Sequence, residues 1–552
     1  MAEIDPATEA ERRLLTGSAR GRTIALSDLA PEERSVRADL LRAIWLDPAA
    51  GGEDLDVGGA HIRGRLNLEG ATLRSARFSD TTFDDELVLR SATLTRLELV
   101  DCRLHVLRGL GAHFSHSFTV VRSRVLVGMG LDSICVTGAV RLQGLQIGDD
   151  PAVTCLSIRR ASVGDLYLTD GCQVVGRVDL SGTTVAGEVG LDDATLQATA
   201  GPALSLIGVE AETFRILDSR FRAADGPAVF ISGTRARNVL LADATVQGQV
   251  SLQHCEIEGL LFVDRCEVAG VSIAVVSTSS TIGTIRICDS SLSGLSCADT
   301  LILTSFGCLR SRISNRGGVA LHLGLSTVRG LFSIEDVTFD GVVNLKESSL
   351  HILGDDLGNG PDRLGSWGSA DGLLLNGLTY SFGEGANQEP ALRHLWLAHT
   401  VDHEPSSWRQ LSEVYQAVGQ EQDAVRTLIA KEDDRLDRAQ LSWRRKTWLR
   451  FLRVTIGYGY RSWLARVWSL AVIVVYSAIV SANASAFVAD GRADLQPVAY
   501  AADTFLPIID LDQAAHWSAG GWVAWTEWGV IIAGWVLSTL FVAGFTRIVR
   551  TL

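Results

Sequence analysis

The chain has 552 residues, a hydrophobic content of 47% and a net charge of −14, a length that suggests roughly two to four domains. Its hydrophobic excess is concentrated in two uncharged stretches, Val467–Ala489 and Trp528–Thr546, and such stretches exclude an entirely water-soluble protein. The charged N-terminal residues contain no signal-like apolar run. Nine cysteines without a C-x-x-C pair argue against a disulfide or metal framework; they are expected as buried core residues, with Cys135 as the doubtful case.

A helical cap is expected at the N-terminal end of the chain, over residues 1–51. Apolar residues recur at helical spacing inside Pro31–Asp47: Leu40, Leu41, Ile44 and Trp45. The cap precedes a long run of short strands, and stacked strands leave an open β-edge at each end that invites aggregation. We therefore predict that this helix covers the first edge.

A repeat with a period of five follows. Each unit has two mostly apolar residues separated by one, as in Leu66-x-Leu68, Ala71-x-Leu73, Ala76-x-Phe78, Thr81-x-Phe83, Leu166-x-Leu168, Val250-x-Leu252 and Ser348-x-Leu350. Alternation by two places both residues on one face of a short strand. The chain must turn after each pair, and polar dipeptides supply the turns: Arg74-Ser75, Ser79-Asp80, Arg90-Ser91 and Ser181-Gly182.

Four such sides close a square coil, and successive coils stack through backbone hydrogen bonds. The pattern predicts a mainly β protein with a right-handed quadrilateral β-helix over residues 52–385. At about 20 residues and roughly 4.8 Å per coil, residues 52–350 form a rod of roughly 70 Å. An ordinary β-sandwich is the alternative, and such short strands disfavour it. The spacing resembles the A-x-L-x-x unit of the pentapeptide-repeat family in many turns, though not in all.

Two groups of polar residues beyond the rod are candidate metal ligands. Gly354–Gly372 is rich in Gly and Asp and is predicted to be a loop; calcium binding by Asp355, Asp356 and Asp362 is disfavoured because regular ligand spacing is missing. Nearby histidines have a spacing that can bind a metal, but surface or packed histidines are the preferred interpretation: His394, His399 and His403. No metal-binding residue is therefore expected.

A helical connector is predicted over residues 386–462. Within Pro405–Arg438 the apolar and small residues match a single tetratricopeptide-like helical hairpin: Trp408, Leu411, Tyr415, Gly419, Ala424 and Leu428. One hairpin cannot bury its apolar face alone, so it is expected to dock on its own chain or, as the alternative, on a partner.

A two-span transmembrane hairpin is predicted over residues 463–552, because a span needs about 20 apolar residues. Tryptophans flank the stretches as in interfacial belts: Trp463, Trp468, Trp522, Trp525 and Trp528. Arginines crowd Arg435–Arg466 and recur at Arg547 and Arg550, whereas the acidic loop Asp490–Glu527 has only Arg492. The positive-inside rule then predicts a multi-pass protein of the cytoplasmic membrane with both termini and the rod in the cytoplasm, and the basic segment is expected to attract anionic lipids.

One local motif is similar to a potassium-channel selectivity filter: Thr455-Ile456-Gly457-Tyr458-Gly459. A filter lies between the spans, after a pore helix, whereas this motif precedes the first span. The loop from Tyr500 to Asp510 is compatible with a short re-entrant helix, so a degenerate two-span pore is the main alternative function.

The whole layout resembles an actinobacterial family of membrane-associated pentapeptide-repeat-like proteins, often labelled "membrane-associated oxidoreductase". The residues that carry the resemblance are Val36–Leu41, Gly59–Leu68, and Trp408–Lys431 with Ile456–Tyr460. The resemblance covers nearly the full length. It implies a bacterial membrane protein with a β-helix, and it brings no established catalytic residues.

The oxidoreductase label finds little support in the sequence. Gly109-Leu-Gly111-Ala-His-Phe114 lacks the third glycine of a dinucleotide fingerprint, and no phosphate loop or nucleophile elbow is found. No catalytic or cofactor-binding residue and no cofactor is therefore predicted. The expected function is a membrane-anchored, non-enzymatic scaffold for an unknown cytoplasmic protein, with the pore and then an oxidoreductase as alternatives. A DNA-mimicking, topoisomerase-binding rod is disfavoured by its mild acidity and its anchor, and nucleic acid is not expected as a partner.

Overall fold

The computed structural model describes residues 6–18, 23–46, 54–270, 273–383, 386–439, 441–461, 463–489 and 494–551, with side chains given for these except 17–18, 489 and 543–551. Asp47, Asp490 and Arg492, which entered the sequence analysis, lie outside the described residues, as do the side chains of Arg547 and Arg550. The chain divides into two compact units, Met1–Val401 and Asp402–Leu552.

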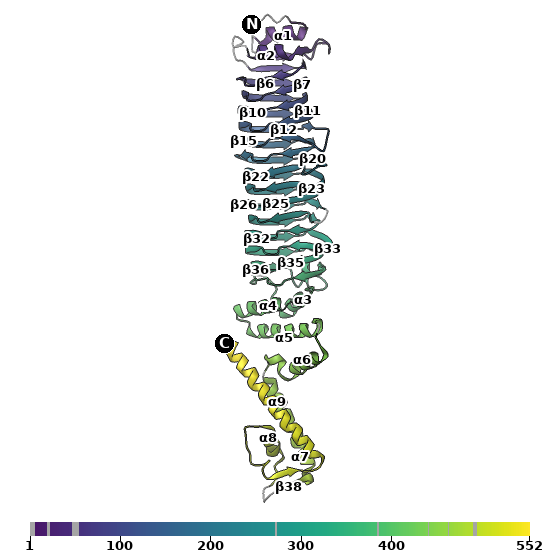
Figure 1. Ribbon diagram of the computed structural model, residues 1–552, viewed down its shortest axis with the longest axis vertical. Helices are drawn as coiled ribbons and strands as arrows, with labels where there is room; N and C mark the ends of the chain where they lie inside the picture. Colours follow the sequence, from purple (N-terminus) through teal and green to yellow (C-terminus); the bar gives the residue numbers. More distant parts are fainter. Residues whose placement is uncertain are drawn as a thin grey trace. The chain divides into compact units, whose positions relative to one another are not determined.

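The first unit is a parallel β-solenoid of about 14 turns, which confirms the predicted β-helix fold (Figure 1). One sheet contains β1 (Ile24–Ala25), β3 (Leu55–Gly58), β6 (Ser75–Ser79), β8 (Thr93–Val100), β10 (His113–Val121), β12 (Cys135–Gln143), β15 (Ser162–Thr169), β18 (Thr184–Val185), β19 (Glu188–Asp192), β22 (Glu210–Leu217), β24 (Arg235–Ala242), β26 (Glu256–Asp264), β29 (Thr281–Cys288), β32 (Leu301–Leu309), β34 (Thr327–Glu335) and β36 (Ser349–Asp355).

The other sheet closes the remaining sides of the coils. It contains β2 (Ser35–Arg37), β4 (His61–Arg63), β5 (Leu66–Asn67), β7 (Thr82–Val88), β9 (Arg103–Arg108), β11 (Arg124–Gly130), β13 (Gln146–Ile147), β14 (Thr154–Ser157), β16 (Gln173–Val175), β17 (Arg177–Asp179), β20 (Thr195–Ala198), β21 (Leu204–Ile207), β23 (Arg220–Ser232), β25 (Thr245–Gln253), β27 (Glu267–Ala269), β28 (Val275–Thr278), β30 (Ser291–Leu292), β31 (Leu295–Ser296), β33 (Arg312–His322), β35 (Thr338–Asn344) and β37 (Gly372–Leu374).

Each coil has four sides because each long strand bends once in its middle. In the coil formed by β10 and β11, the buried pairs are Ala112/Phe114, Phe118/Val120, Ser123/Val125 and Met129/Leu131. The pairing register shifts between Phe114 and Ser117 in β10 and between Val125 and Gly128 in β11, at the two bends. The inward pairs predicted from the sequence are therefore the sides of the coil.

Coil length varies more than the five-residue period predicted. His113 pairs with Cys135, and Cys135 pairs with Ser162, so these coils advance by 22 and 27 residues. Thr281 and Leu301 are 20 residues apart, the predicted value. Coils longer than the predicted figure of about 20 residues arise where bends hold additional loop residues, such as 148–153 between β13 and β14.

Inward side chains stack into columns along the solenoid. One column consists of Ile24, Val57, Phe78, Leu99, Val120, Leu142, Leu168, Leu191, Ile216, Leu241, Val263, Ile287, Cys308, Ile334 and finally Asp355. Each member lies directly opposite the equivalent residue of the next coil. The column is apolar until its last position, where a carboxylate replaces the hydrophobic side chain.

The turns between the two sheets use left-handed backbone conformations. After the strands of the first sheet, the left-handed residues other than glycine are Asp80, Asp101, Arg122, Asp170, Asp193, Asp218, Asp243, Arg265, Asp289, Arg310 and Asp336. Aspartate tolerates this conformation better than most residues. Among the predicted turn dipeptides, Ser79-Asp80, Arg90-Ser91 and Ser181-Gly182 each contain a left-handed residue, whereas Arg74-Ser75 leads into the extended β6.

The N-terminal end is covered by α1 (Glu9–Ser18) and α2 (Ala38–Leu46). The predicted cap helix is shorter than Pro31–Asp47 because Ser35–Arg37 forms β2, which pairs with β4. Glu11, buried in α1, accepts the backbone N–H of Arg37 at 3.0 Å and its Nε at 2.9 Å. Burial opposes ionisation of Glu11, but the bonds from Arg37 outweigh it and hold the pKa of Glu11 below its ordinary value.

The C-terminal end of the solenoid is closed by α3 (Pro390–Ala398) and a buried ion pair. Arg393 of α3 donates two hydrogen bonds, of 2.8 and 2.9 Å, to Asp355, and both side chains are fully buried. The Trp367 indole adds a third bond to Asp355, of 2.9 Å, and Arg393 also donates to the carbonyl of Asn387 at 2.7 Å. The carboxylate at the end of the inward column is therefore fully compensated.

Replacing Asp355 by Ala should strongly destabilise the solenoid, because it leaves the Arg393 guanidinium buried without its counter-ion. Breaking a buried pair in this way costs about 3–5 kcal/mol. Chemical denaturation of the detergent-solubilised full chain measures the loss. The control is Glu212→Ala in β22, which breaks an exposed pair with Arg237 and should hardly change the denaturation midpoint. Equal midpoints for the two variants would contradict this account.

The second unit is helical apart from one short hairpin. Its elements are α4 (Pro405–Ala417), α5 (Glu421–Arg438), α6 (Trp443–Ile456), η3 (Gly457–Gly459), α7 (Trp463–Ala482), η4 (Ala484–Ala486), β38 (Phe487–Ala489), α8 (Pro497–Phe505), β39 (Trp517–Ala519) and α9 (Trp522–Thr551). The predicted tetratricopeptide-like hairpin is present as α4 and α5. Gly419 adopts a φ of 78° in the turn, and Trp408, Leu411 and Tyr415 are buried.

Two helices of this unit are long and apolar enough to cross a membrane, Trp463–Ala482 and Trp522–Val542, and most of each is exposed. Both helices begin at tryptophans expected to border the spans, Trp463 and Trp522, whereas the uncharged stretches Val467–Ala489 and Trp528–Thr546 have different bounds from the helices. The first helix ends earlier because Asn483 donates its side-chain amide to the Ile479 carbonyl and the chain then enters β38. The second begins earlier, at Trp522, directly after β39.

Candidate functional site

The three aspartates considered for calcium are engaged within the protein. Asp355 pairs with Arg393. Asp356 accepts the backbone N–H and hydroxyl of Ser366, at 2.8 and 2.7 Å, and Asp362 accepts the Leu364 N–H. These bonds fold the loop back onto the last coil. Across the described residues, no three His, Cys, Asp or Glu side chains come together as metal ligands.

The histidines of the connector also have individual partners. The His399 ring contacts the Ala370 carbonyl at 2.9 Å, within the first unit. His403 belongs to the second unit, where its Nδ1 lies 2.6 Å from Asp434. The same carboxylate holds Arg438 of α5. His394 lies in α3 and is half-buried. The histidine spacing therefore serves helix packing.

The glycine pair tested as a dinucleotide motif forms a solenoid turn. Gly111 adopts a φ of 67° between β9 and β10, and Phe114 is buried in the core. A phosphate-binding loop needs a helix N-terminus after the glycines, and β10 follows here instead.

The filter-like motif forms a tight turn between α6 and α7. Gly457, Tyr458 and Gly459 all have positive φ, of 53°, 55° and 91°. The Tyr458 side chain is buried and donates its hydroxyl to Asp433 of α5 at 2.8 Å. Arg453 pairs with the same carboxylate at 3.1 Å. The motif thus fixes the angle between two helices.

Separate shallow hollows lie along the side of the solenoid beside the left-handed turns, and together they are called the groove. Its N-terminal part has a volume of 730 Å³ and is lined by Asp101, Arg103, Arg122 and Arg124, among others. A second part, of 560 Å³, lies farther along the same side and contains Arg265 and several of its neighbours. Sequence reasoning missed this surface, although one Asp or Arg per coil at the turn position was a signal.

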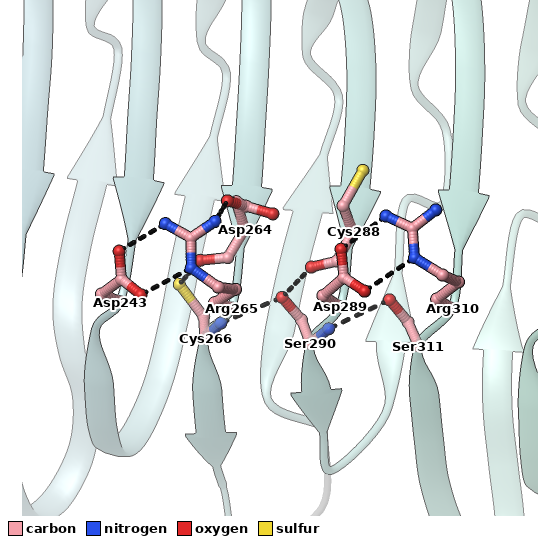
Figure 2. A network of polar contacts seen from close by, with 9 residues as sticks. All are labelled: Asp243, Asp264, Arg265, Cys266, Cys288, Asp289, Ser290, Arg310 and Ser311. Atoms are coloured by element: carbon pink, nitrogen blue, oxygen red, sulfur yellow. Dashed lines mark hydrogen bonds and ion pairs between the residues drawn. The ribbon is translucent and has the colours of Figure 1, made fainter.

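Polar ladders connect the coils along this groove (Figure 2). Arg265 donates to Asp243 at 2.7 and 2.6 Å. Arg310 makes the equivalent pair with Asp289 two coils further on. Directly inside, the backbone N–H of Cys266 donates to the hydroxyl of Ser290 at 3.0 Å. These groups bond to one another and thereby hold the turns in register.

Eight cysteines are buried in the core, as the sequence predicted, and Cys135, the doubtful case, is exposed. Burial raises the pKa of Cys102 and Cys172 to about 11 and that of Cys297 and Cys308 to about 12. Because the thiolate is the reactive form, these side chains are packing residues, and they make no pair with one another.

The native protein should therefore react with one equivalent of maleimide near pH 8, where roughly a thousandth of a thiol with a pKa of about 11 is ionised. Cys135→Ser should abolish the reaction, and unfolding in urea should expose the other eight thiols. Counting labels by mass spectrometry gives the result. Rapid labelling of Cys102 or Cys172 in the folded protein would contradict the burial described here.

Helix α6 carries both aromatic and basic side chains at the surface. Exposed apolar residues are Trp443, Trp448, Phe451 and Val454. Its basic residues are Arg444, Arg445, Lys446, Arg450 and Arg453. The positive charge was predicted from the sequence, whereas this separate helix was not. The tryptophans among the arginines were a signal for it.

Helix α8 packs against both membrane-length helices, α7 and α9. Tyr500 of α8 is buried beside Tyr476 and donates its hydroxyl to Glu527 of α9 at 2.7 Å. Gly534 lies where α8 and α9 approach most closely, since a Cβ there would collide with the carbonyl oxygen of Phe505. Helix α8, which lies between the two membrane-length helices in sequence, is therefore packed against both of them.

Gly534→Ala should separate α8 from α9 and lower the stability of the helical unit by about 1–3 kcal/mol, the usual cost of overpacking. Gly529→Ala is the control on the same helix, because a Cβ there has no neighbour within 4 Å and alanine favours helix. Thermal unfolding of the two full-length variants in detergent checks this, and a midpoint unchanged by Gly534→Ala would refute the close contact.

Comparison of the chain with protein families, curated proteins and solved structures found no match. The class of the protein therefore rests on its own features. They define a parallel β-solenoid joined to a helical unit with two membrane-length helices.

Proposed function

We propose that the protein is a membrane-anchored, non-enzymatic scaffold that presents its solenoid to cytoplasmic proteins. The observation that carries the proposal is the combination of a long stacked solenoid with a pair of helices long and apolar enough to cross a membrane. The polar groups beside the groove bond from coil to coil, which favours a rigid binding surface over a reactive centre. The resemblance to membrane-associated pentapeptide-repeat proteins stays a prediction.

Charge supports one orientation of this scaffold. Arginines precede the first span in α6, and Arg547 and Arg550 follow the second. The residues between the spans are acidic instead, including Asp503 and Asp510. By the positive-inside rule, the solenoid and both chain ends then lie on the cytoplasmic side of the cytoplasmic membrane.

Cys135 provides the test of this orientation. A membrane-impermeant maleimide should label Cys135 in inverted vesicles and not in intact spheroplasts, because the thiol is exposed on the solenoid. In a Cys135→Ser background, Ile508→Cys, at an exposed position between the spans, should give the opposite pattern. Labelling of Cys135 from outside the cell, or extraction of the chain from membranes by carbonate, would refute the proposal.

A two-span pore is the second candidate, and the packing of α8 between α7 and α9 favours it. Against it, the filter-like motif is a buried turn held by Asp433. Ion flux through vesicles containing the purified protein would establish the pore, whereas no flux is expected for a scaffold. An absorbance spectrum with a flavin or haem band would instead favour the oxidoreductase alternative.

A further inference from the structure

We propose that α6 lies in the plane of the membrane interface and binds the phosphate headgroups of anionic lipids. The inference rests on the proposed membrane anchor and deepens it, because it assigns a second attachment and a lipid class to the segment before the first span. Its basis is the combination of exposed aromatic side chains, cations without ion-pair partners and a fixed junction with α7.

One face of α6 exposes a large apolar surface. At 100° per residue, Trp443, Val454, Phe451 and Trp448 fall within an arc of about 140°. Their exposed fractions are 72%, 57%, 40% and 54%, and the rings of Phe451 and Trp448 are stacked at 5.5 Å. Aromatic rings in such a row are typical of helices that lie at the membrane interface.

The opposite face of α6 is cationic. Arg445, Arg453, Lys446 and Arg450 fall within an arc of similar width. Arg453 is paired with Asp433, whereas the other three form no ion pair with any described residue. Arg444 falls inside the aromatic arc, with its guanidinium 5.6 Å from the Trp443 ring, and its long stem can reach the headgroup level from there.

The junction with α7 fixes α6 close to the start of the first span. The Trp468 indole of α7 donates to the carbonyl of Val454 at 3.0 Å. The turn between the helices is buried and held to α5 through Tyr458. Because α7 begins at Trp463, an interfacial residue type, α6 is placed beside the headgroups when α7 crosses the bilayer.

Lipid is the occupant that matches both faces. Aromatic side chains enter the boundary between headgroups and acyl chains, while arginine and lysine remain among phosphates at the same depth. A protein partner would have to supply an apolar groove rimmed with acidic groups. The adjoining span brings the bilayer to α6 in every copy of the chain, so the membrane is the surface that α6 meets first.

The test uses spin labels on the full-length protein in vesicles of phosphatidylcholine with and without phosphatidylglycerol. In a Cys135→Ser background, single cysteines are introduced by Trp448→Cys on the aromatic face, Arg445→Cys on the cationic face and Val474→Cys in the middle of α7. Collisions with oxygen, which concentrates in lipid, and with a water-soluble nickel complex report the surroundings of each label.

The expected result is oxygen access at position 474, oxygen access at a shallower depth at position 448, and nickel access at position 445. Replacing Arg445, Lys446 and Arg450 by Gln removes three positive charges. With the label at position 448, each removed charge should weaken the binding of α6 to the phosphatidylglycerol surface by roughly fivefold. The same neutralisation should have little effect in phosphatidylcholine alone.

Different outcomes separate the two proposals. Nickel access at position 448 with oxygen access at position 474 would overturn the interfacial helix and leave the anchor standing. Nickel access at position 474 would overturn the anchor itself. A label at position 448 shielded from both reagents would indicate that protein covers this face, and insensitivity to phosphatidylglycerol would overturn headgroup binding.

Discussion

Each coil of the solenoid takes its backbone hydrogen bonds from the coils before and after it, so every coil must stay in register with its neighbours. The column from Ile24 to Asp355 shows the result, since one inward residue follows another across the whole stack. A single residue inserted within a side would turn the following side chains from the core to the solvent. Insertions are therefore confined to bends, such as 148–153, and the coils differ in length while their inward pairs stay aligned.

The same requirement makes the two ends of the stack different from its middle, because the outermost backbone groups have no further coil to bond with. At the N-terminal end, β1 and β2 extend both sheets, and Glu11 of α1 binds Arg37. At the C-terminal end, a carboxylate enters the inward column and recruits Arg393 from α3. A buried charge there would be costly against another apolar side chain, so the Asp355–Arg393 pair marks the end of this inward column.

The parts of the fold that follow from local spacing were predictable from the sequence, and those that depend on tertiary contacts were not. Inward pairs, buried cysteines and the α4–α5 hairpin are each encoded within a few residues, as Gly419 at the hairpin turn illustrates. Coil length was not predictable, because loop residues at bends leave the inward pairs unchanged. The end of α7 depends on the side chain of Asn483, which hydropathy does not detect. The role of the turn at Gly457–Gly459 became clear only through Asp433, a residue of a neighbouring helix.

Charge is distributed differently in the two units, and the difference bears on what each surface can bind. On the solenoid, many arginines are neutralised by an aspartate or glutamate of the adjacent coil, as in Arg122–Asp101, Arg265–Asp243 and Arg310–Asp289. These pairs are exposed and contribute little stability singly, and each places a carboxylate beside a guanidinium. In α6, Arg445, Lys446 and Arg450 have no such neighbours among the described residues. In the proposed arrangement, the unpaired cations of α6 adjoin the first membrane-length helix, whereas these three solenoid arginines are offset by carboxylates of adjacent coils, so we expect lipid attraction to be strongest at α6.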